Sequence, residues 1–462
     1  MNYLLGIDVG TSATKTVLFD EKGTVIASAS QEYPLYQPEN GWAEQKAEDW
    51  RDAVLKTLKE VMKLSGVPAE EVKGIGISGQ MHGLVMLDEQ GEVLRPSIIW
   101  CDQRTGEEVE DMLRIMPKER WIQITANPPL TGWTAAKILW VRKHEPEIYA
   151  RCRHILLPKD YIRYILTGVF ATEVSDASGM QLLDVPGRCW SDEVLEKLEI
   201  PKEWLGTVYE SCQVTGTLLP EIAEQTGLST EVKVVGGAGD NAAAAVGTGV
   251  VRDGSAFTTI GTSGVVFAHS SKVTIDPKGR VHTCCCAVPG AWHVMGVTQG
   301  AGLSLKWFKD QFCQDYVAEA KKQGVDVYDL INRDIEKIPV GSDRLLYLPY
   351  LMGERTPHLD PDCRGVFFGL SAIHTKAHLL RAVMEGVSYS LADCNEILKE
   401  MGVDVDQMMA CGGGGKSPIW RQMLSDLYQC QVKTVYQSEG PALGVAILAG
   451  VGCGIYESVE SA

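Results

Sequence analysis

The sequence has no excess of positive charge and no long apolar run. Its 43 Lys and Arg residues stand against 60 Asp and Glu, and a formal net charge of −17 argues against nucleic acid or an anionic membrane as the main partner. No apolar run reaches membrane-spanning length, and the first residues lack a basic region followed by an apolar stretch and a cleavage site. We therefore expect a cytoplasmic protein with no membrane and no nucleic-acid partner.

The sequence also lacks the spacings of the common metal and hydrolase motifs. Its thirteen cysteines include no Cys-x-x-Cys pair, and the run Cys284, Cys285 and Cys286 falls in a predicted strand. This pattern is typical of reduced, mostly buried thiols. No HExxH occurs, nor a G-x-S-x-G in a suitable context, so the metalloprotease and α/β-hydrolase hypotheses have no support.

A length of 462 residues is too great for one ordinary hydrophobic core, so two domains or more are expected. Residues 105–230 carry a mainly helical pattern between strand-rich segments. Apolar spacing predicts three clear helices, and short apolar runs predict strands in the first eighty residues. The helices are expected at 46–64, 377–399 and 440–450, and the strands at 3–8, 14–19 and 72–77.

The tripeptide Gly-Thr-Ser occurs at residues 10–12 and again at 261–263, each time between two apolar strands. Coincidence is one explanation, because these residue types are common in turns. The matching strand context favours a duplicated α/β architecture of two similar halves. The boundary then falls near residues 245–254, and we assign one domain to 1–246 and the other to 247–462.

Asp240 lies where a predicted strand passes into an Ala-rich helix, which is where α/β folds place their ligands. The second Gly-Thr-Ser hairpin follows closely, and its backbone N–H groups can face a phosphate. A phosphoryl-transfer enzyme needs a positioned base for the attacking hydroxyl, so Asp240 is the candidate. The alternative is that Asp240 only caps the following helix.

Asp8 precedes the first glycine hairpin, and an acid there can hold Mg²⁺ directly or through water. The N–H groups of Gly10, Thr11 and Ser12 would then contact phosphate oxygens. A turn-forming aspartate is the alternative for Asp8. Lys15 could reach a phosphate, although a solvated strand lysine is favoured.

Two further strand ends carry polar clusters, Gln80, Met81 and His82 in one and Trp100, Asp102 and Arg104 in the other. A hydroxyl-rich ligand beside an apolar wall would suit both clusters. For the first cluster, the alternative is that Met81 is simply buried and that His82 is hydrogen-bonded within the protein. For the second, it is that Asp102 and Arg104 form a structural ion pair.

Residues 410–417, ACGGGGKS, come close to a Walker A loop, but Ala410 replaces the first glycine and Pro418 follows the serine. No strand ending in a Walker-B-type Asp is evident after it. We favour instead a glycine loop that contacts adenine or ribose from the C-terminal half of the chain.

Longer segments carry a family resemblance. GWTAAKILWV at 132–141 and GVFFGL at 365–370, with HL and AVME after it, match two signature segments, and the similarity runs from GIDVGTSATK to EGPALGVAILA. The chain resembles the FGGY carbohydrate kinases of the actin–hexokinase-like ATPase superfamily. The resemblance implies two ribonuclease-H-like domains with ATP bound in the cleft between them.

The resemblance also implies a reaction, the phosphorylation of D-xylulose at its 5-hydroxyl by ATP with Mg²⁺, and a homodimer. Asp240 corresponds to the general base, and Asp8 to the acid near Mg²⁺. The remaining positions match the sugar site at Met81, His82, Trp100, Asp102, Arg104 and Asn241, the phosphate hairpins at Thr11, Gly261 and Thr262, and the nucleotide loop at Gly413 and Gly414.

Two alternatives remain open for the function. The substrate could be another ketopentose or a polyol. The chain could also be a non-catalytic regulator that binds a sugar or a nucleotide, because fold does not fix function. The presence of Asp240, Asp8 and both hairpins argues against a regulator.

Overall fold

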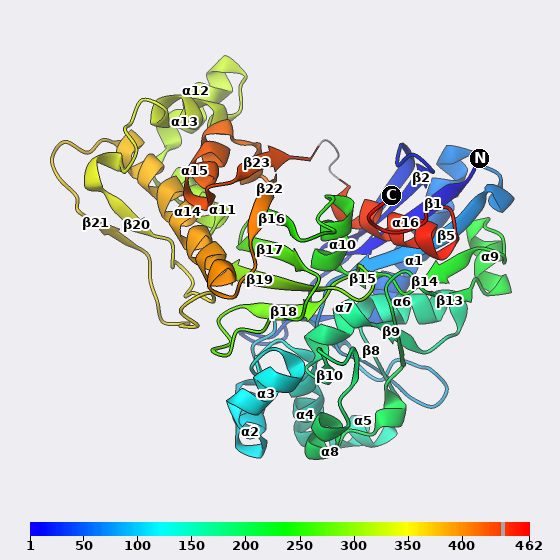
Figure 1. Ribbon diagram of the computed structural model, residues 1–462. Helices are drawn as coiled ribbons and strands as arrows, with labels where there is room; N and C mark the ends of the chain where they lie inside the picture. The colour runs from blue at the N-terminus through cyan, green and yellow to red at the C-terminus, as the bar shows by residue number, and fades with distance from the viewer. Residues whose placement is uncertain (436–438) are drawn as a thin grey trace.

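Two mixed sheets form the centre of the computed structural model, which describes residues 1–435 and 439–462 (Figure 1). The first sheet has the order β13 (Val214–Thr217), β14 (Lys233–Val235), β5 (Val72–Gly79), β1 (Tyr3–Val9), β2 (Ala13–Asp20) and β3 (Val25–Glu32), with β15 (Ala238–Gly239) paired to β5. The second has the order β18 (His282–Cys285), β19 (Trp292–Thr298), β17 (Gly264–Ser270), β16 (Gly254–Ile260), β22 (Val405–Cys411) and β23 (Gln431–Thr434).

The two sheets share one topology. In the first, the antiparallel hairpin β1–β2 continues into the parallel neighbour β5, and in the second the hairpin β16–β17 continues into the parallel neighbour β22. Each hairpin turn holds one copy of Gly-Thr-Ser. The duplicated α/β architecture predicted from this repeat is confirmed.

Helices cover both sheets where the apolar spacing predicts them. α1 (Ala47–Ser65) buries Trp50, Val54 and Leu58 against the first sheet, and α14 (Lys376–Glu400) packs on β17 and β19 of the second. Helix α14 is in turn contacted by α11 (Gly302–Phe312), α13 (Val327–Ile335) and α15 (Pro418–Tyr428), and α12 (Gln314–Gln323) packs on α11 and α13. All three predicted helices are confirmed.

The C-terminal helix α16 (Gly440–Gly452) returns to the first sheet and packs on its strands, chiefly β5 and β1, as the red helix beside the blue strands in Figure 1 shows. Glycines in the strands allow this close approach, because a Cβ on Gly6 or Gly76 would lie 1.9 Å from a carbonyl oxygen of α16. The helix also packs on α10 (Asp240–Gly247). The domain boundary predicted between residues 246 and 247 assigns α16 to the second domain, although the helix packs on the first sheet. The boundary itself stays a prediction.

A mainly helical group fills the chain between β5 and β14, as predicted. Its apolar core includes Trp121 and Trp140, both buried. The helices are α2 (Gly106–Ile115), α3 (Lys118–Thr125), α4 (Thr134–His144), α5 (Pro146–Arg151), α6 (Pro158–Thr167), α7 (Val174–Ala177), α8 (Asp192–Leu198) and α9 (Pro220–Thr226). Helices α2, α3, α4, α5 and α8 lie at the bottom of Figure 1, and α6 and α9 contact α1.

Short elements complete the chain. Two-stranded pairs are formed by β4 (Glu44–Gln45) with β7 (Ser97–Ile98), β6 (Val85–Leu87) with β8 (His154–Leu156), β9 (Ala171–Glu173) with β12 (Thr207–Tyr209), β10 (Leu183–Asp184) with β11 (Cys189–Trp190), and β20 (Leu346–Leu348) with β21 (Val366–Phe368). The 3₁₀ helices are η1 (Ala69–Glu71), η2 (Ser178–Met180), η3 (Lys202–Trp204), η4 (Ser342–Arg344) and η5 (Gly414–Lys416). Within residues 1–435 and 439–462, no helix has both the length and the apolar character needed to span a bilayer.

Candidate active site

A cavity of about 320 Å³ lies between the two halves of the chain. The first half contributes Met81, His82, Trp100, Trp133, Asp240 and Asn241 to its wall. The second half contributes Thr259, Ser263, Val265, His282, Cys284, Met295, Val297 and Arg355. Five residues predicted for the sugar site or the base therefore meet in one place, although they come from distant segments.

Asp240 is the first residue of α10, directly after β15. Its Oδ1 accepts hydrogen bonds from the backbone N–H of Asn241 at 2.7 Å and from Nδ2 of Asn241 at 2.9 Å. The carboxylate does not cap the next turn of the helix, so capping alone does not explain it. Burial, and then the negative charge of Asp8, raise the pKa of Asp240 to about 7. A carboxylate with that pKa suits a general base at neutral pH.

Asp8 lies in β1, opposite Ser78 of β5 and Lys15 of β2. Burial raises the pKa of its carboxyl group, and the nearby Ser78 hydroxyl and the positive charge of Lys15 partly oppose the shift. Among the described residues, Oδ1 of Asp8 is buried and has no hydrogen-bond partner. An unpaired buried carboxylate oxygen is costly in an isolated protein, which makes it a candidate ligand atom.

His82 lies three residues after the end of β5, in a left-handed conformation with φ of 67°. Nζ of Lys137 donates to its carbonyl oxygen at 2.7 Å, and Oγ1 of Thr134 donates at 3.1 Å. Nδ1 lies 2.8 Å from the carbonyl oxygen of Gly179, which can only accept. Nδ1 of His82 therefore carries the proton, and the neutral ring keeps Nε2 as an acceptor.

The aromatic wall of the cavity was only partly predicted. Trp133 stacks on His82 with ring centroids 4.6 Å apart, and it also contacts His282. Nδ1 of His282 lies 3.0 Å from Oδ1 of Asn127. Burial lowers the pKa of His82 and of His282 to about 3, so both rings are neutral. Trp133 adjoins Thr134 and Lys137 in the GWTAAK segment, whereas no local pattern marks His282.

Three residues predicted for the sugar site do not line the cavity, and Gln80 is the first of them. Its Nε2 donates to Oε1 of Gln45 at 2.7 Å, and its backbone N–H donates to the carbonyl oxygen of Val9 at 2.9 Å. Gln80 is 1% exposed. The side chain therefore joins the end of β5 to the first hairpin instead of facing a ligand.

Asp102 and Arg104 form the structural ion pair that was the alternative for them. Their closest N–O distance is 2.8 Å, and both side chains are buried. Asp102 also accepts from the backbone N–H of Ala43 at 2.6 Å. Arg104 pairs with Glu44 at 2.8 Å, and its guanidinium lies 3.6 Å from the ring centroid of Trp42. The polar atoms of Asp102 and Arg104 that were predicted to bind the sugar are therefore already bonded within the protein.

The first hairpin turn contacts the cavity wall through Thr11. Nε1 of Trp100 donates to Oγ1 of Thr11 at 2.9 Å, so the wall and the turn are joined. The backbone N–H of Gly10 donates to the carbonyl oxygen of Ala13 and closes the turn. Lys15 was expected to be solvated, but its Nζ lies 2.6 Å from a carboxylate oxygen of Glu439.

A second cavity, of about 540 Å³, lies on the other side of the 261–263 turn. Gly261, Thr262, Gly413 and Gly414 line it, as expected for a nucleotide site, whereas Ser263 lines the first cavity. The backbone N–H groups of Gly302 and Leu303, at the start of α11, donate to the carbonyl oxygens of Gly261 and Thr262. Further lining residues are Asp326, Tyr328, Asn332 and Lys306. One turn therefore lies between the two cavities.

Ser417 argues against a Walker A loop. Its hydroxyl accepts from the backbone N–H of Trp420 as the N-cap of α15 and donates to Oδ1 of Asn332 at 2.9 Å. Gly414 packs against Ile260, where a Cβ would lie 2.4 Å from that side chain, while Gly413 faces open space. The glycine loop is a packed element of the second cavity, in line with the alternative favoured from the sequence.

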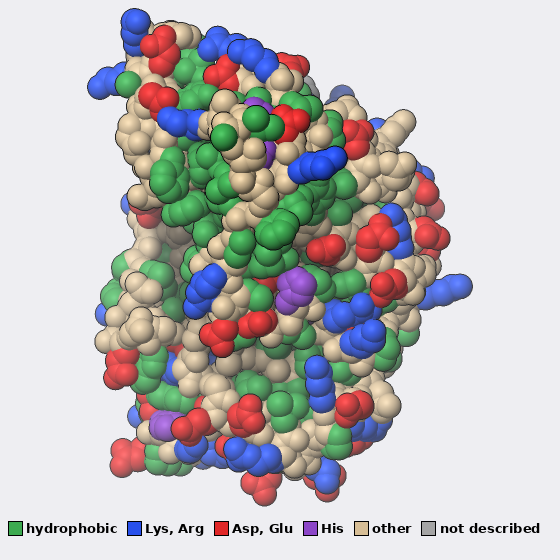
Figure 2. Space-filling model, turned by 90° about the vertical axis from the view of Figure 1, so that its left-hand side faces the viewer, with side chains coloured by type: hydrophobic (Ala, Val, Ile, Leu, Met, Phe, Trp, Pro, Cys, Tyr) green, Lys and Arg blue, Asp and Glu red, His purple; other side chains and the backbone are tan. Residues whose placement is uncertain are grey.

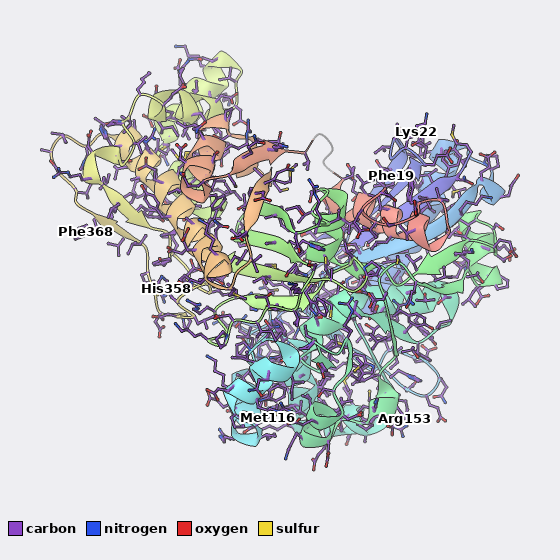
Figure 3. The ribbon with its side chains drawn as sticks, in the orientation of Figure 1. Phe19, Lys22, Met116, Arg153, His358 and Phe368 are labelled. Carbon is purple, nitrogen blue, oxygen red and sulfur yellow. The ribbon has the colours of Figure 1, made fainter. Side chains whose placement is uncertain are left out.

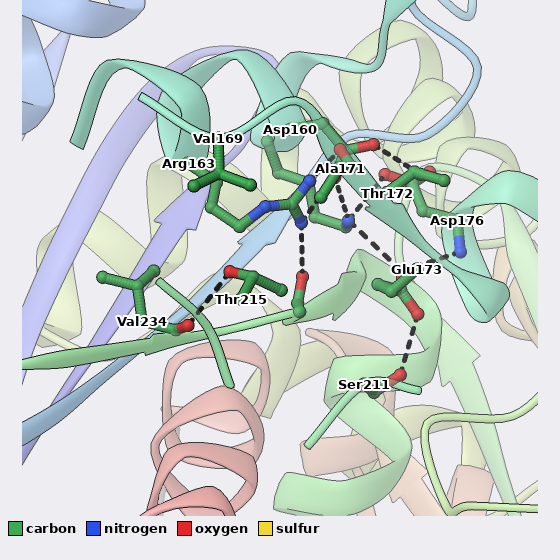
Figure 4. A network of polar contacts seen from close by, with 12 residues as sticks. Asp160, Arg163, Val169, Ala171, Thr172, Glu173, Asp176, Ser211, Thr215 and Val234 are labelled. Carbon is green, nitrogen blue, oxygen red and sulfur yellow. Dashed lines mark hydrogen bonds and ion pairs between the residues drawn. The ribbon is translucent and has the colours of Figure 1, made fainter. Parts of the chain in front are cut away.

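Buried charged side chains that include Asp160, Glu173 and Asp176 form a network of polar contacts (Figure 4). Nζ of Lys159 lies 2.7 Å from Asp160, 3.2 Å from Glu173 and 3.6 Å from Asp176. Glu173 accepts from Oγ of Ser175 at 2.9 Å, and Oγ of Ser175 accepts from the backbone N–H of Gly239 at 3.1 Å. The network therefore reaches the residue before Asp240. It fixes the start of α10.

Comparison with known proteins places this site in a family. The N-terminal domain of the FGGY family of carbohydrate kinases matches residues 3–247, and the C-terminal domain of that family matches residues 256–453. The chain belongs to the FGGY family of carbohydrate kinases. As an FGGY kinase it is a sugar kinase that uses ATP, and its two adjacent cavities suit two substrates.

Individual relatives agree with the family. The FGGY kinase is 41% identical over 462 residues to the xylulose kinase of Bacillus subtilis, with 100% of this chain and 90% of the relative covered. It is 33% identical to the gluconokinase of the same organism, over 100% of this chain and 89% of the relative. The crystal structure of xylulose kinase from Rhodospirillum rubrum matches with a TM-score of 0.93 at 29% identity, covering 100% of this chain and 92% of that one.

Proposed function

We propose that this FGGY kinase transfers the terminal phosphoryl group of ATP to the 5-hydroxyl of D-xylulose. The observation that carries the proposal is the position of Asp240, in the wall of the smaller cavity and close to the turn that lies between the two cavities. A hydroxyl bound beside Asp240 faces a phosphate held at that turn. The identity to xylulose kinases over the whole chain supports this sugar.

Asp240 is the general base in this proposal. Its carboxylate accepts the proton of the attacking 5-hydroxyl as that oxygen bonds to the terminal phosphorus of ATP, while the bond from this phosphorus to its bridging oxygen breaks and ADP leaves. The start of α10 stabilises the ionised form through the helix dipole. Met81 and Trp133 provide the apolar wall, while Nε2 of His82 and the amide of Asn241 offer polar contacts to the sugar hydroxyls.

The two hairpins bind the phosphates of ATP in this proposal. Gly10, Thr11 and Ser12 approach from the first sheet, and Gly261 and Thr262 approach from the second. The larger cavity accepts the nucleoside, with Gly413 and Gly414 against it. Its position next to the sugar cavity allows the two substrates to meet at the 261–263 turn.

The residues present also fit Mg²⁺. Magnesium is commonly held by one or two carboxylates, with water and substrate phosphates supplying the other ligands. Oδ1 of Asp8 is such an oxygen, buried and without a hydrogen-bond partner among the described residues. We propose that Asp8 holds the ion, directly or through water. The bound ion neutralises charge on the transferred phosphate.

Coupled ADP release over a panel of sugars tests the proposed function. We expect D-xylulose to stimulate ATP turnover above the sugar-free rate, and Asp240→Asn to abolish turnover while sugar binding persists. Comparable turnover by that variant would remove Asp240 from the base role. Gluconate belongs in the panel because of the gluconokinase relative, together with other ketopentoses and polyols. If no sugar stimulates turnover, the alternative of a binding regulator gains support.

We further propose that two copies of the chain associate through the β20–β21 face. Hydrophobic side chains gather on the upper part of the face in Figure 2, on the side where Figure 1 places β20 and β21. Phe368 projects there (Figure 3) and is 69% exposed. Other exposed apolar side chains nearby in the chain are Leu346, Leu348, Met352, Val366, Leu370 and Ile373. Patches of this kind often mark protein interfaces.

We also propose that the enzyme works in the cytoplasm. All thirteen cysteines lie within the described residues and carry free thiols. Free thiols in this number are typical of a reducing compartment. Burial raises the pKa of the Cys284 and Cys394 thiols, which keeps both unreactive.

A further inference from the structure

Arg355 lines the sugar cavity but has no function in the proposed reaction. Its side chain is partly buried, and burial lowers the pKa of its guanidinium below the ordinary value. Within residues 1–435 and 439–462, no carboxylate, carbonyl or aromatic ring is paired with this guanidinium by a hydrogen bond, an ion pair or a ring contact. A guanidinium with unused N–H donors in the wall of a cavity can bind acceptor oxygens, so a ligand in the cavity is expected to pair with it.

The backbone on both sides of Arg355 is held firmly. Oε1 of the buried Glu354 accepts from the backbone N–H groups of Gln299 at 2.8 Å and of Arg355 at 2.7 Å. The backbone of Thr356 donates to the carbonyl oxygen of Val297 at 3.0 Å, and Oγ1 of Thr356 accepts from the N–H of Val297 at 3.1 Å. These bonds attach the segment to the end of β19. The guanidinium is therefore positioned at the cavity by a rigid support.

Arg355 and Asp240 line the cavity from opposite halves of the chain, Arg355 beside the end of β19 and Asp240 at the start of α10. The positive charge of Arg355 acts on His82 and His282, and it lowers the pKa of both rings in addition to the larger effect of burial. The charge that acts on Asp240 is that of Asp8. A sugar whose reacting hydroxyl lies at Asp240 therefore shares one cavity with the two histidines and with Arg355 on the wall contributed by the second half.

We propose that Arg355 binds the sugar away from the phosphorylated hydroxyl and selects for two adjacent oxygens there. A guanidinium presents parallel N–H donors in a planar fork. A carbonyl beside a hydroxyl, as in a 2-keto sugar, matches this fork, and a carboxylate matches it better. A polyol lacks the carbonyl acceptor and fits less well. This inference rests on the proposed function, because it takes the sugar to lie with its reacting hydroxyl at Asp240.

The test uses the full chain with Arg355→Met and Arg355→Lys. Arg364→Met is the matched control, because Arg364 is exposed in the same loop and donates only to nearby backbone carbonyls. Calorimetry without ATP measures the binding of D-xylulose, of xylitol and of D-xylonate, the five-carbon sugar acid. Steady-state kinetics measures KM for sugar and for ATP, and circular dichroism checks folding.

The wild-type protein should bind D-xylonate at least as tightly as D-xylulose, and xylitol more weakly than both. Arg355→Met should weaken D-xylonate binding by about tenfold or more and D-xylulose binding by less, because hydrogen bonds to a charged acceptor are the stronger ones. Arg355→Lys should keep part of the D-xylonate affinity. KM for ATP should stay within about twofold, and Arg364→Met should match the wild type.

Two results would overturn the inference. One is equal loss of affinity for D-xylonate and xylitol in a folded Arg355 variant, which would mean that the guanidinium does not distinguish the oxygens. The other is a rise in KM for ATP without a change in sugar binding, which would make Arg355 a phosphate contact. Because the calorimetric comparison needs no turnover, it still tests Arg355 if the enzyme fails to phosphorylate D-xylulose.

Discussion

Nζ of Lys137 donates to the backbone carbonyl oxygen of His82 at 2.7 Å, although more than fifty residues separate them in the chain. Lys137 is fully buried, and His82 lines the sugar cavity. Burial lowers the pKa of Lys137 to about 7, with Asp102 opposing the shift. The pair holds His82 in its left-handed backbone conformation and aims the ring at the sugar cavity.

Lys137→Met should therefore weaken sugar binding more than it slows catalysis. Without the ammonium group, His82 keeps only the donor from Thr134, and its ring becomes less well positioned. We expect KM for the sugar to rise about tenfold with a smaller change in kcat. Lys143→Met in the same helix is the control, since Lys143 is exposed and pairs with Glu107. A fall in kcat alone would contradict a positioning role.

Asp240 should make the ligand-free protein less stable as pH rises. Its pKa is about 7 in the folded protein and 3.8 for an unperturbed aspartate, so the folded state retains a proton that the unfolded state releases. Stability is therefore lost between about pH 4 and pH 7. Asp240→Asn keeps an acceptor for Asn241 and has no such loss. We expect it to be more stable than wild type by about 1–3 kcal/mol at pH 8, a value discounted for solvent at the cavity.

Urea unfolding at pH 5 and pH 8, with a chelator and no substrates, measures this effect. The difference between the variant and the wild type should grow with pH. If the two proteins differed in stability by the same amount at pH 5 and at pH 8, the pKa of Asp240 would not be raised in the folded protein.

Lys159→Met should strongly destabilise the protein. The substitution leaves Asp160, Glu173 and Asp176 buried without their shared cation. Removing one partner of a buried ion pair typically costs about 3–5 kcal/mol. Urea unfolding is the measurement, and Lys197→Met on the exposed side of α8 should change stability by less than about 0.5 kcal/mol. Equal stability of the two variants would mean that the network contributes little.

Gly76→Ala should displace α16 from the first sheet. The added Cβ would lie 1.9 Å from the carbonyl oxygen of Val445, and neither backbone can move without disturbing its neighbours. We expect a loss of about 2–4 kcal/mol in urea unfolding. Gly106→Ala is the control, because a Cβ added at Gly106 would meet no heavy atom within 4 Å and this residue begins a helix. It should be neutral or slightly stabilising.

Phe368→Glu should convert a dimer to a monomer. A carboxylate in the apolar β20–β21 face must be desolvated when two copies meet, and like charges then oppose each other across a twofold axis. Light scattering after gel filtration measures the mass. Leu64→Glu is the control, since Leu64 is 62% exposed at the end of α1. A monomeric wild type, or a dimeric Phe368→Glu, would contradict the proposed interface.

Most of the fold could be predicted from the sequence because helix spacing and turn motifs depend only on residues that are close together in the chain. The apolar spacing of α1 and α14 and the repeated Gly-Thr-Ser turns are visible within a few residues of sequence. The return of α16 to the first sheet is not local, and it depends on glycines at positions 6 and 76, far away in the chain. The sequence pattern of α16 therefore did not indicate on which sheet the helix packs.

The candidate site divides in the same way. Asp240, Asp8, Met81 and His82 stand at strand ends, where the sequence pattern already indicates a ligand. Asp102 and Arg104 stand at a strand end too, yet they pair with each other and with Glu44. Charged residues that are close in sequence can bind a ligand or pair with each other. Which of the two occurs depends on the residues that surround them in the folded protein.

By itself the sequence determined the duplicated sheet topology, the family and the acid that faces the sugar cavity, because strand period, turn chemistry and strand-end position are properties of adjacent residues. Only the tertiary structure decided that Trp133, His282 and Arg355 complete that cavity. It also decided that Lys15 is paired with Glu439. These relationships join segments up to several hundred residues apart, and packing between the two halves, not local preference, sets them.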